Sequence, residues 1–146
     1  MSDRKTVYDA VVTALRDSTG VSYVTRDAET WTNWGSNKFP GVYLNDDSEE
    51  HSWLAYPSTD TDDMEAAIEF TAHSAVFDWD GSAEVDEVRA QLISDITSTV
   101  MSSTAVDDVT ADVLVSSVET DAYTAERYGV CAVRFRARYF YNHASP

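Results

Sequence analysis

The stretch that decides the fold is Gly129-Val-Cys-Ala-Val-Arg-Phe-Arg-Ala-Arg-Tyr-Phe-Tyr141, close to the end of the chain. It is rich in β-branched and aromatic residues and has no internal Gly or Pro, which is typical of a strand. Side chains alternate between the two faces of a strand, so the stretch separates into two sets. One face carries Cys131, Val133, Phe135, Ala137, Tyr139 and Tyr141, and the other carries Val130, Ala132, Arg134, Arg136, Arg138 and Phe140. We predict a long strand with one core face and one face that presents three arginines.

A second long strand is predicted over Met64–Phe77, where the same alternation holds. One face is apolar and the other is mixed, which is typical of an antiparallel sheet with one covered face. The apolar set is Ala66, Ile68, Phe70, Ala72, Ser74 and Val76, and the mixed set is Ala67, Glu69, Thr71, His73, Ala75 and Phe77. We expect this strand to pair with the last one.

Two stretches have helical periodicity. Thr6–Asp17 has an apolar stripe, with Asp3 or Ser2 as its cap and Gly20 beyond its end. The second begins at Ser82 and ends near Ser102. Its stripe is the clearest in the chain and consists of Val85, Val88, Leu92, Ile96 and Val100.

The remaining segments are shorter strands and loops. Strands are predicted at Val21–Thr25, Gly41–Leu44, His51–Tyr56 and Val109–Val118, and a polar turn at Asn45–Glu50. Only one long helix interrupts the strands, so the pattern is not an alternating β-α-β one. The sequence therefore predicts a single α+β domain over residues 1–146, with a mainly antiparallel or mixed β-sheet and two α-helices packed on one face.

The charge of the chain is unusual. There are 26 Asp and Glu against 10 Lys and Arg, a formal net charge of −16, and the only lysines are Lys5 and Lys38. The acids are spread along the chain, so they repel one another until salt shortens the Debye length to about 3 Å at 1 M. An ordinary acidic protein is the alternative, but dispersed acids and scarce lysine favour a halophilic source.

Several classes of protein and site find no support in the sequence. It has no run of about 18 apolar residues and no secretory leader, so we expect a chain that stays where it is made, with no membrane association. The lone Cys131 excludes an internal disulfide and is expected to be a small buried hydrophobe. His51, His73 and His143 lack the spacing of a zinc site, and the acidic clusters at Asp60–Asp63 and Asp78–Asp80 are expected by chance.

No nucleophile elbow, phosphate-binding loop or dinucleotide fingerprint occurs either. We therefore predict a non-enzymatic chain with no catalytic residue, cofactor or metal ligand.

Two features are candidate contact sites. The arginine row Arg134, Arg136 and Arg138 has three interpretations: pairing with acids of the neighbouring strand such as Glu69, contact with another subunit, or contact with nucleic acid along a ring lumen. The loop Arg26–Pro40 carries Trp31, Trp34 and Phe39. These aromatic side chains either fold back on the core or contact a partner, since Trp is enriched at binding hot spots.

The layout resembles the tail-terminator (tail-completion) proteins of long-tailed viruses over nearly the whole chain. The resemblance lies in an opening helix, a loop that ends in Phe39-Pro40-Gly41-Val42-Tyr43-Leu44, the long strand Met64–Phe77, an amphipathic helix, a Val-rich strand and the closing strand that ends in Arg-Tyr-Phe-Tyr. It implies a virion protein that forms a homo-hexameric ring, caps the tail tube and joins it to the head-completion (neck) protein while DNA passes. With the acidic composition, it implies a virus of a halophilic archaeal host, assembled in the host cytoplasm.

Two alternatives remain open. The chain is another neck or tube protein of such a virion, or it is a small cytosolic ligand-binding domain or enzyme of a halophile. The second alternative requires a deep pocket with convergent polar groups.

Overall fold

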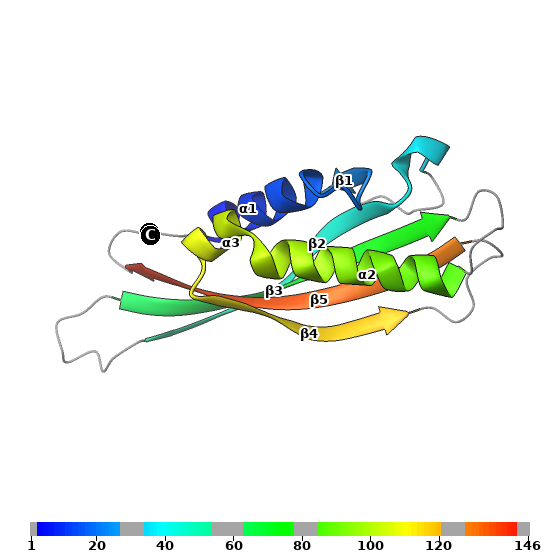
Figure 1. Cartoon of the computed structure of the whole chain (residues 1–146). Helices are drawn as coiled ribbons and strands as arrows, with labels where there is room; N and C mark the ends of the chain where they lie inside the picture. Colours follow the sequence, from blue (N-terminus) through cyan, green and yellow to red (C-terminus); the bar gives the residue numbers. More distant parts are fainter. Residues whose placement is uncertain (1–2, 27–33, 54–62, 78–84, 121–127, 143–146) are drawn as a thin grey trace.

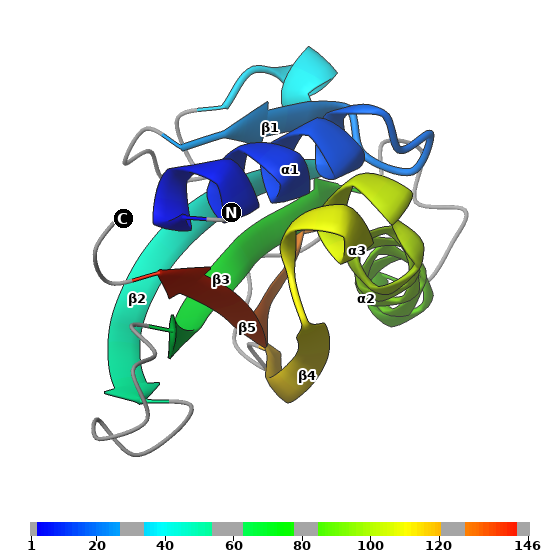
Figure 2. The same ribbon diagram turned by 90° about the vertical axis from the view of Figure 1, so that its left-hand side faces the viewer.

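The computed structural model describes residues 3–26, 34–53, 63–77, 85–120 and 128–142. In chain order the elements are α1 (Arg4–Arg16), β1 (Tyr23–Thr25), the 3-10 turn η2 (Ser36–Lys38), β2 (Gly41–Trp53), β3 (Asp63–Phe77), α2 (Val85–Ser102), α3 (Thr104–Val109), β4 (Asp112–Thr120) and β5 (Tyr128–Asn142). They form two layers, with the three helices on one side of a curved sheet (Figures 1 and 2). The predicted α+β class is confirmed.

The closing strand lies inside the sheet. The strand order is β1-β2-β3-β5-β4, in which β1 and β2 are parallel and every other pair is antiparallel. The predicted pairing of the two long strands is therefore confirmed, with Phe70 of β3 opposite Phe135 of β5. Because β5 has a strand on both sides, each of its two faces contributes to the inner part of one side of the sheet.

The core lies between the helices and one face of the sheet. The predicted apolar residues of β5 that are described, from Cys131 to Tyr139, are at most 4% exposed, and those of β3 are buried too. The rings of Phe70 and Phe135 stack at 5.3 Å, and Tyr8 of α1 meets Phe70 edge-on at 5.7 Å. Burial of each large apolar side chain stabilises the fold by about 1.5–3 kcal/mol.

The first helix begins at its predicted cap. The side chain of Asp3 accepts a hydrogen bond from the backbone N–H of Thr6 at 2.7 Å, which satisfies a free donor of the first turn. The same bond holds the pKa of Asp3 below its ordinary value. Val7, Val11 and Leu15 of the predicted stripe are all fully buried.

The predicted turn at Asn45–Glu50 was wrong. These residues form the middle of β2, which joins the two predicted strands Gly41–Leu44 and His51–Tyr56 into one, although residues 54–56 lie outside the described part. The strand pairs with β3 along its whole length, with an irregularity between Asp46 and Ser48. Pairing with a fifteen-residue neighbour has overridden the low strand propensity of Asn, Asp and Glu.

The predicted strand Val109–Val118 was also partly wrong. Its first residue, Val109, is the last residue of the short helix α3, and β4 begins at Asp112 and ends at Thr120. Ser103 caps α3 by accepting a hydrogen bond from the N–H of Val106, whose side chain is buried in the core. The capped helix therefore extends to Val109, and the strand starts three residues later than its β-branched composition predicted.

Gly41 provides a test of the packing at the start of β2. A Cβ atom there would lie 2.5 Å from the Trp34 ring and against the backbone oxygen of Lys38, whereas one on Gly35 would approach only the Asn37 side chain, at 3.3 Å. We expect Gly41→Ala to lower the free energy of unfolding by about 1–3 kcal/mol, because the site is already full. The matched control Gly35→Ala should lower the free energy of unfolding much less. If urea unfolding shows the same loss of free energy for both variants, the packing of Trp34 on Gly41 is contradicted.

Candidate interaction surface

The arginine row lies on the sheet face opposite the helices. Arg134, Arg136 and Arg138 alternate along β5 with the buried core residues, and each side chain is 35–48% exposed. Carboxylates of three neighbouring strands surround the row. They are Glu65 and Glu69 on β3, Asp47 and Glu50 on β2, and Asp112 on β4.

Arg138 makes the closest contacts of the row. Its Nη1 donates to Glu65 Oε1 at 2.9 Å, and its Nε lies 2.9 Å from both carboxylate oxygens of Asp112, which also accepts from Nη2. The planar guanidinium matches the carboxylate with two parallel donors. This bond holds the pKa of Asp112 below its ordinary value, and the two carboxylates raise that of Arg138. One side chain thus links β3, β5 and β4.

Arg136 lies between two carboxylates. Its Nη1 is 3.7 Å from Glu69, its cross-strand partner on β3, and its Nη2 is 3.7 Å from Glu50 on β2. These separations are ion pairs rather than short hydrogen bonds. The pairing of this row with Glu69 was predicted from the sequence. The pairing of Arg136 with Glu50 was not predicted, because Glu50 was assigned to a turn.

Arg134 is held through a buried threonine. Its Nε lies 3.5 Å from Thr71 Oγ1 and 3.6 Å from Asp47 Oδ2, and Thr71 donates its hydroxyl hydrogen to Asp47. Thr71 is only 3% exposed, and Asp47 lies at the irregularity of β2, which turns its side chain toward β3 and β5. The bulge therefore brings an acid from β2 to an arginine two strands away.

The local charge of the row is negative. The three guanidinium groups face five carboxylates, which leaves a net charge of −2. The arrangement confirms the interpretation of intramolecular pairing. It does not favour a phosphate backbone, which binds where cations are in excess. A contact of this face with another subunit or with DNA stays a prediction.

Two aromatic side chains, Trp34 and Phe39, cover one end of this same face. Trp34 and Phe39 are each 8% exposed and pack on Ala75, with Trp34 5.6 Å from the ring of Tyr23 and 5.7 Å from that of Phe39. Of the two alternatives, these two residues therefore fold back on the domain. Trp31 lies outside the described residues, so its contact with a partner stays a prediction.

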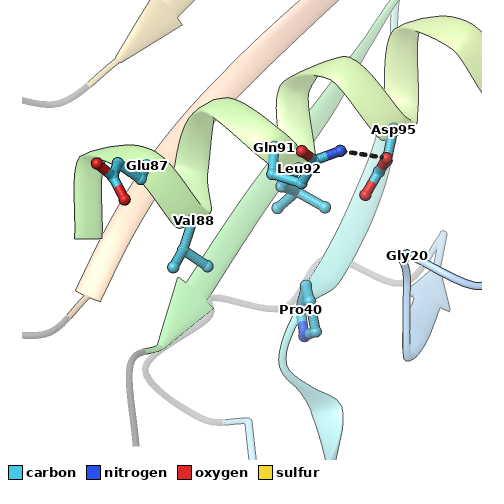
Figure 3. A pocket seen from close by; sticks show the side chains of 7 residues that line it. All are labelled: Gly20, Pro40, Glu87, Val88, Gln91, Leu92 and Asp95. Atoms are coloured by element: carbon cyan, nitrogen blue, oxygen red, sulfur yellow. Dashed lines mark hydrogen bonds between the residues drawn. The ribbon is translucent and has the colours of Figure 1, made fainter. Parts of the chain in front are cut away.

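A pocket of about 290 Å³ lies beside α2 (Figure 3). Its apolar part comes from Pro40, Val88 and Leu92, and Gly20 lies at its edge. Its polar part consists of Glu87, Gln91 and Asp95, where Gln91 Nε2 donates to Asp95 Oδ1 at 2.9 Å. The residues drawn in Figure 3 thus combine an aliphatic surface with two carboxylates, and sequence reasoning did not find this pocket.

The described ranges contain no cluster suited to a metal ion. Among these residues, no group of three or more His, Cys, Asp or Glu side chains is arranged to hold a metal ion. Cys131 is buried, as predicted, and burial raises the pKa of its thiol to about 11, far from the thiolate that nucleophilic chemistry needs. No helix in the described part of the chain is long and apolar enough to cross a membrane.

Comparison with protein-family models found no match for this sequence, and comparison with curated proteins found none either.

Replacement of the row by glutamine tests its internal role. We expect Arg134→Gln/Arg136→Gln/Arg138→Gln to lower the melting temperature in low salt, because five carboxylates then face one another without counter-charge. The control Arg4→Gln/Lys5→Gln/Arg16→Gln removes the same charge from α1. The row variant should melt below this control, and the gap should narrow in 3 M KCl as screening increases. Equal melting temperatures in low salt would show that the row contributes net charge alone.

Proposed function

We propose that the chain is a structural subunit of a viral ring that caps the tail tube and joins it to the head-completion proteins. The arrangement of the elements is the observation that supports this proposal best. An opening helix, a loop that leads into a strand, a long strand, an amphipathic helix, a Val-rich strand and a closing strand are the layout by which the sequence resembles tail terminators. The proposed assembly is a homo-hexamer at the head–tail junction of the virion.

The charge of the open sheet face suits a passage for DNA. A ring that DNA must cross works best if it does not retain the phosphate backbone, and binding strength follows the number of phosphates that cations neutralise. Every arginine of the row is already occupied by carboxylates, so this face would give at most weak, non-specific contact.

The net charge of −16 supports a salt-rich environment for the proposed virion. At low ionic strength, neighbouring subunits of a ring would repel one another over distances comparable to the Debye length. At molar salt this length is about 3 Å, so only contacts at van der Waals or hydrogen-bond distance count. A halophilic host provides this condition.

The pocket beside α2 supports a second candidate function, a small ligand-binding domain. Its apolar surface of Val88, Leu92 and Pro40 and its carboxylates Glu87 and Asp95 are suited to an amphipathic cation. The volume of about 290 Å³ is at the lower end of the range for small-molecule sites. A further alternative within the virion is another neck protein or a tube protein.

Immunogold electron microscopy on a high-salt lysate of the source tests the proposal. Antibody against the chain should place gold at the junction between head and tail. Gold along the whole tail would instead identify a tube protein. Label confined to the cytoplasm, with virions unlabelled and the epitope shown to be accessible, would contradict the virion function and favour the ligand-binding candidate.

A further inference from the structure

The open face of the sheet has a pocket where the arginine row ends. Ala132 precedes Arg134 on the same face of β5, so a methyl group takes the place of the next guanidinium. Ala132 is the cross-strand partner of His73 on β3 and of Glu119 on β4. An imidazole and a carboxylate therefore stand on either side of one small side chain.

The His73–Glu119 pocket has a volume of about 350 Å³. This value lies within the range of roughly 300–1,000 Å³ that is usual for small-molecule sites. Its other lining residues are Ala132, Thr120, Val130 and Cys131. The pocket is thus large enough for a planar polar group, and its charged wall is Glu119.

The arginine row shows what the same position holds farther along β5. The guanidinium of Arg138 lies between Glu65 of β3 and Asp112 of β4, and it pairs with both. The same two strands flank Ala132, but β5 supplies no cation there. Glu119 is exposed, and within the described residues it forms no salt bridge. The pocket therefore presents a carboxylate without a counter-charge.

The ring of His73 forms the opposite wall. Tyr43 of β2 stacks on this ring at 5.8 Å, and the pocket lies on the other side of His73, because β3 lies between β2 and β5. Burial holds the pKa of His73 below its ordinary value, and Arg134 lowers it further. These effects outweigh Asp47 and Glu119, which favour the charged ring. A neutral imidazole does not repel a cation, and a guanidinium stacks on such aromatic faces.

These walls suit a guanidinium better than other common cations. Its two parallel donors match the two oxygens of Glu119, and its flat face matches the ring of His73. An ammonium group has no flat face. A metal ion would need more ligands, and no group of three or more His, Cys, Asp or Glu side chains in the described ranges is arranged for one.

The charge of the surroundings indicates how this guanidinium is carried. The amino acid arginine would bring its own carboxylate to a face where the row and its acids already have a net charge of −2. An arginine within a peptide chain has no such carboxylate.

We propose that the His73–Glu119 pocket binds the guanidinium group of an arginine side chain from a partner protein. The group lies between Glu119 and His73, over Ala132, where it continues the arginine row. This inference goes beyond the proposed function, because the pocket belongs to a single chain and requires no ring.

Titration of the full chain with N-acetyl-arginine amide, followed by NMR, tests the ligand. The backbone signals of Ala132 and Glu119 and the ring signals of His73 should shift. N-acetyl-citrulline amide has nearly the same shape without the charge, and it should cause no such shifts. Absence of shifts with the arginine probe, or equal shifts with both probes, would overturn the proposal. Equally tight binding of the amino acid arginine would show a small solute as the ligand and overturn the assignment to a partner protein.

Two matched variants test the place of binding. Glu119→Gln should weaken binding of N-acetyl-arginine amide on the order of tenfold, because it removes one charge-assisted contact. Glu87→Gln removes the same charge from the pocket beside α2 and should bind the probe like the wild type. If Glu87→Gln loses binding and Glu119→Gln retains it, the cation belongs to the pocket beside α2 and the proposal is wrong.

The variant Ala132→Arg tests the position without any ligand. Its guanidinium should fill the pocket, abolish binding of the probe and pair with Glu119. We therefore expect Ala132→Arg to raise the melting temperature in low salt more in the native chain than in the Glu119→Gln chain. Equal changes in the two backgrounds would show that a guanidinium over Ala132 does not contact Glu119, which would contradict the proposed geometry.

Discussion

The structure depends on β5 being central, with one face in the core and the other bound by carboxylates. Phe135 stacks on Phe70 on the helix side, and Arg138 bridges Glu65 and Asp112 on the other side. In a chain of net charge −16, acids on adjacent strands of an open face repel one another unless cations lie between them. The arginine row supplies these cations where three acidic strands meet, so a single strand provides both the hydrophobic centre and the counter-charge of the sheet.

This arrangement explains how the open face remains polar without becoming a basic surface. Exposed ion pairs are each worth little, but several charges in a network share their partners. Arg134 and Arg136 each reach an acid on β2 across the intervening β3, which a single cross-strand pair does not do. The aromatic cluster of Trp34 and Phe39 covers one end of the same face.

The sequence alone was sufficient for the central part of this account. The strict alternation of apolar and polar residues in β3 and β5 predicted which residues are buried. When one face of a strand packs on the core, the alternation assigns every side chain of that strand to one face or the other. The prediction of a turn at Asn45–Glu50 was wrong because local propensity is a weak guide to this strand. The strand pairs with a long partner, and its acidic side chains contact arginines. Glu50 and Asp47 could therefore not be identified as members of the row. The length of β3 was the available signal, since a fifteen-residue strand needs neighbours along its whole length.

The edges and the pocket were beyond prediction for a different reason. Which strand lies at an edge depends on the order β1-β2-β3-β5-β4, and alternation within one strand carries no information about that order. The pocket brings together Gly20, Pro40 and α2, which are far apart in the sequence.

The central claim, that β5 provides the counter-charge of the sheet, is tested most directly by a double-mutant cycle on Arg138 and Asp112, measured by urea unfolding in low salt. Arg138→Gln and Asp112→Asn should each destabilise the fold, and the double variant should lose less than the sum of the two. Strictly additive losses would contradict the claim.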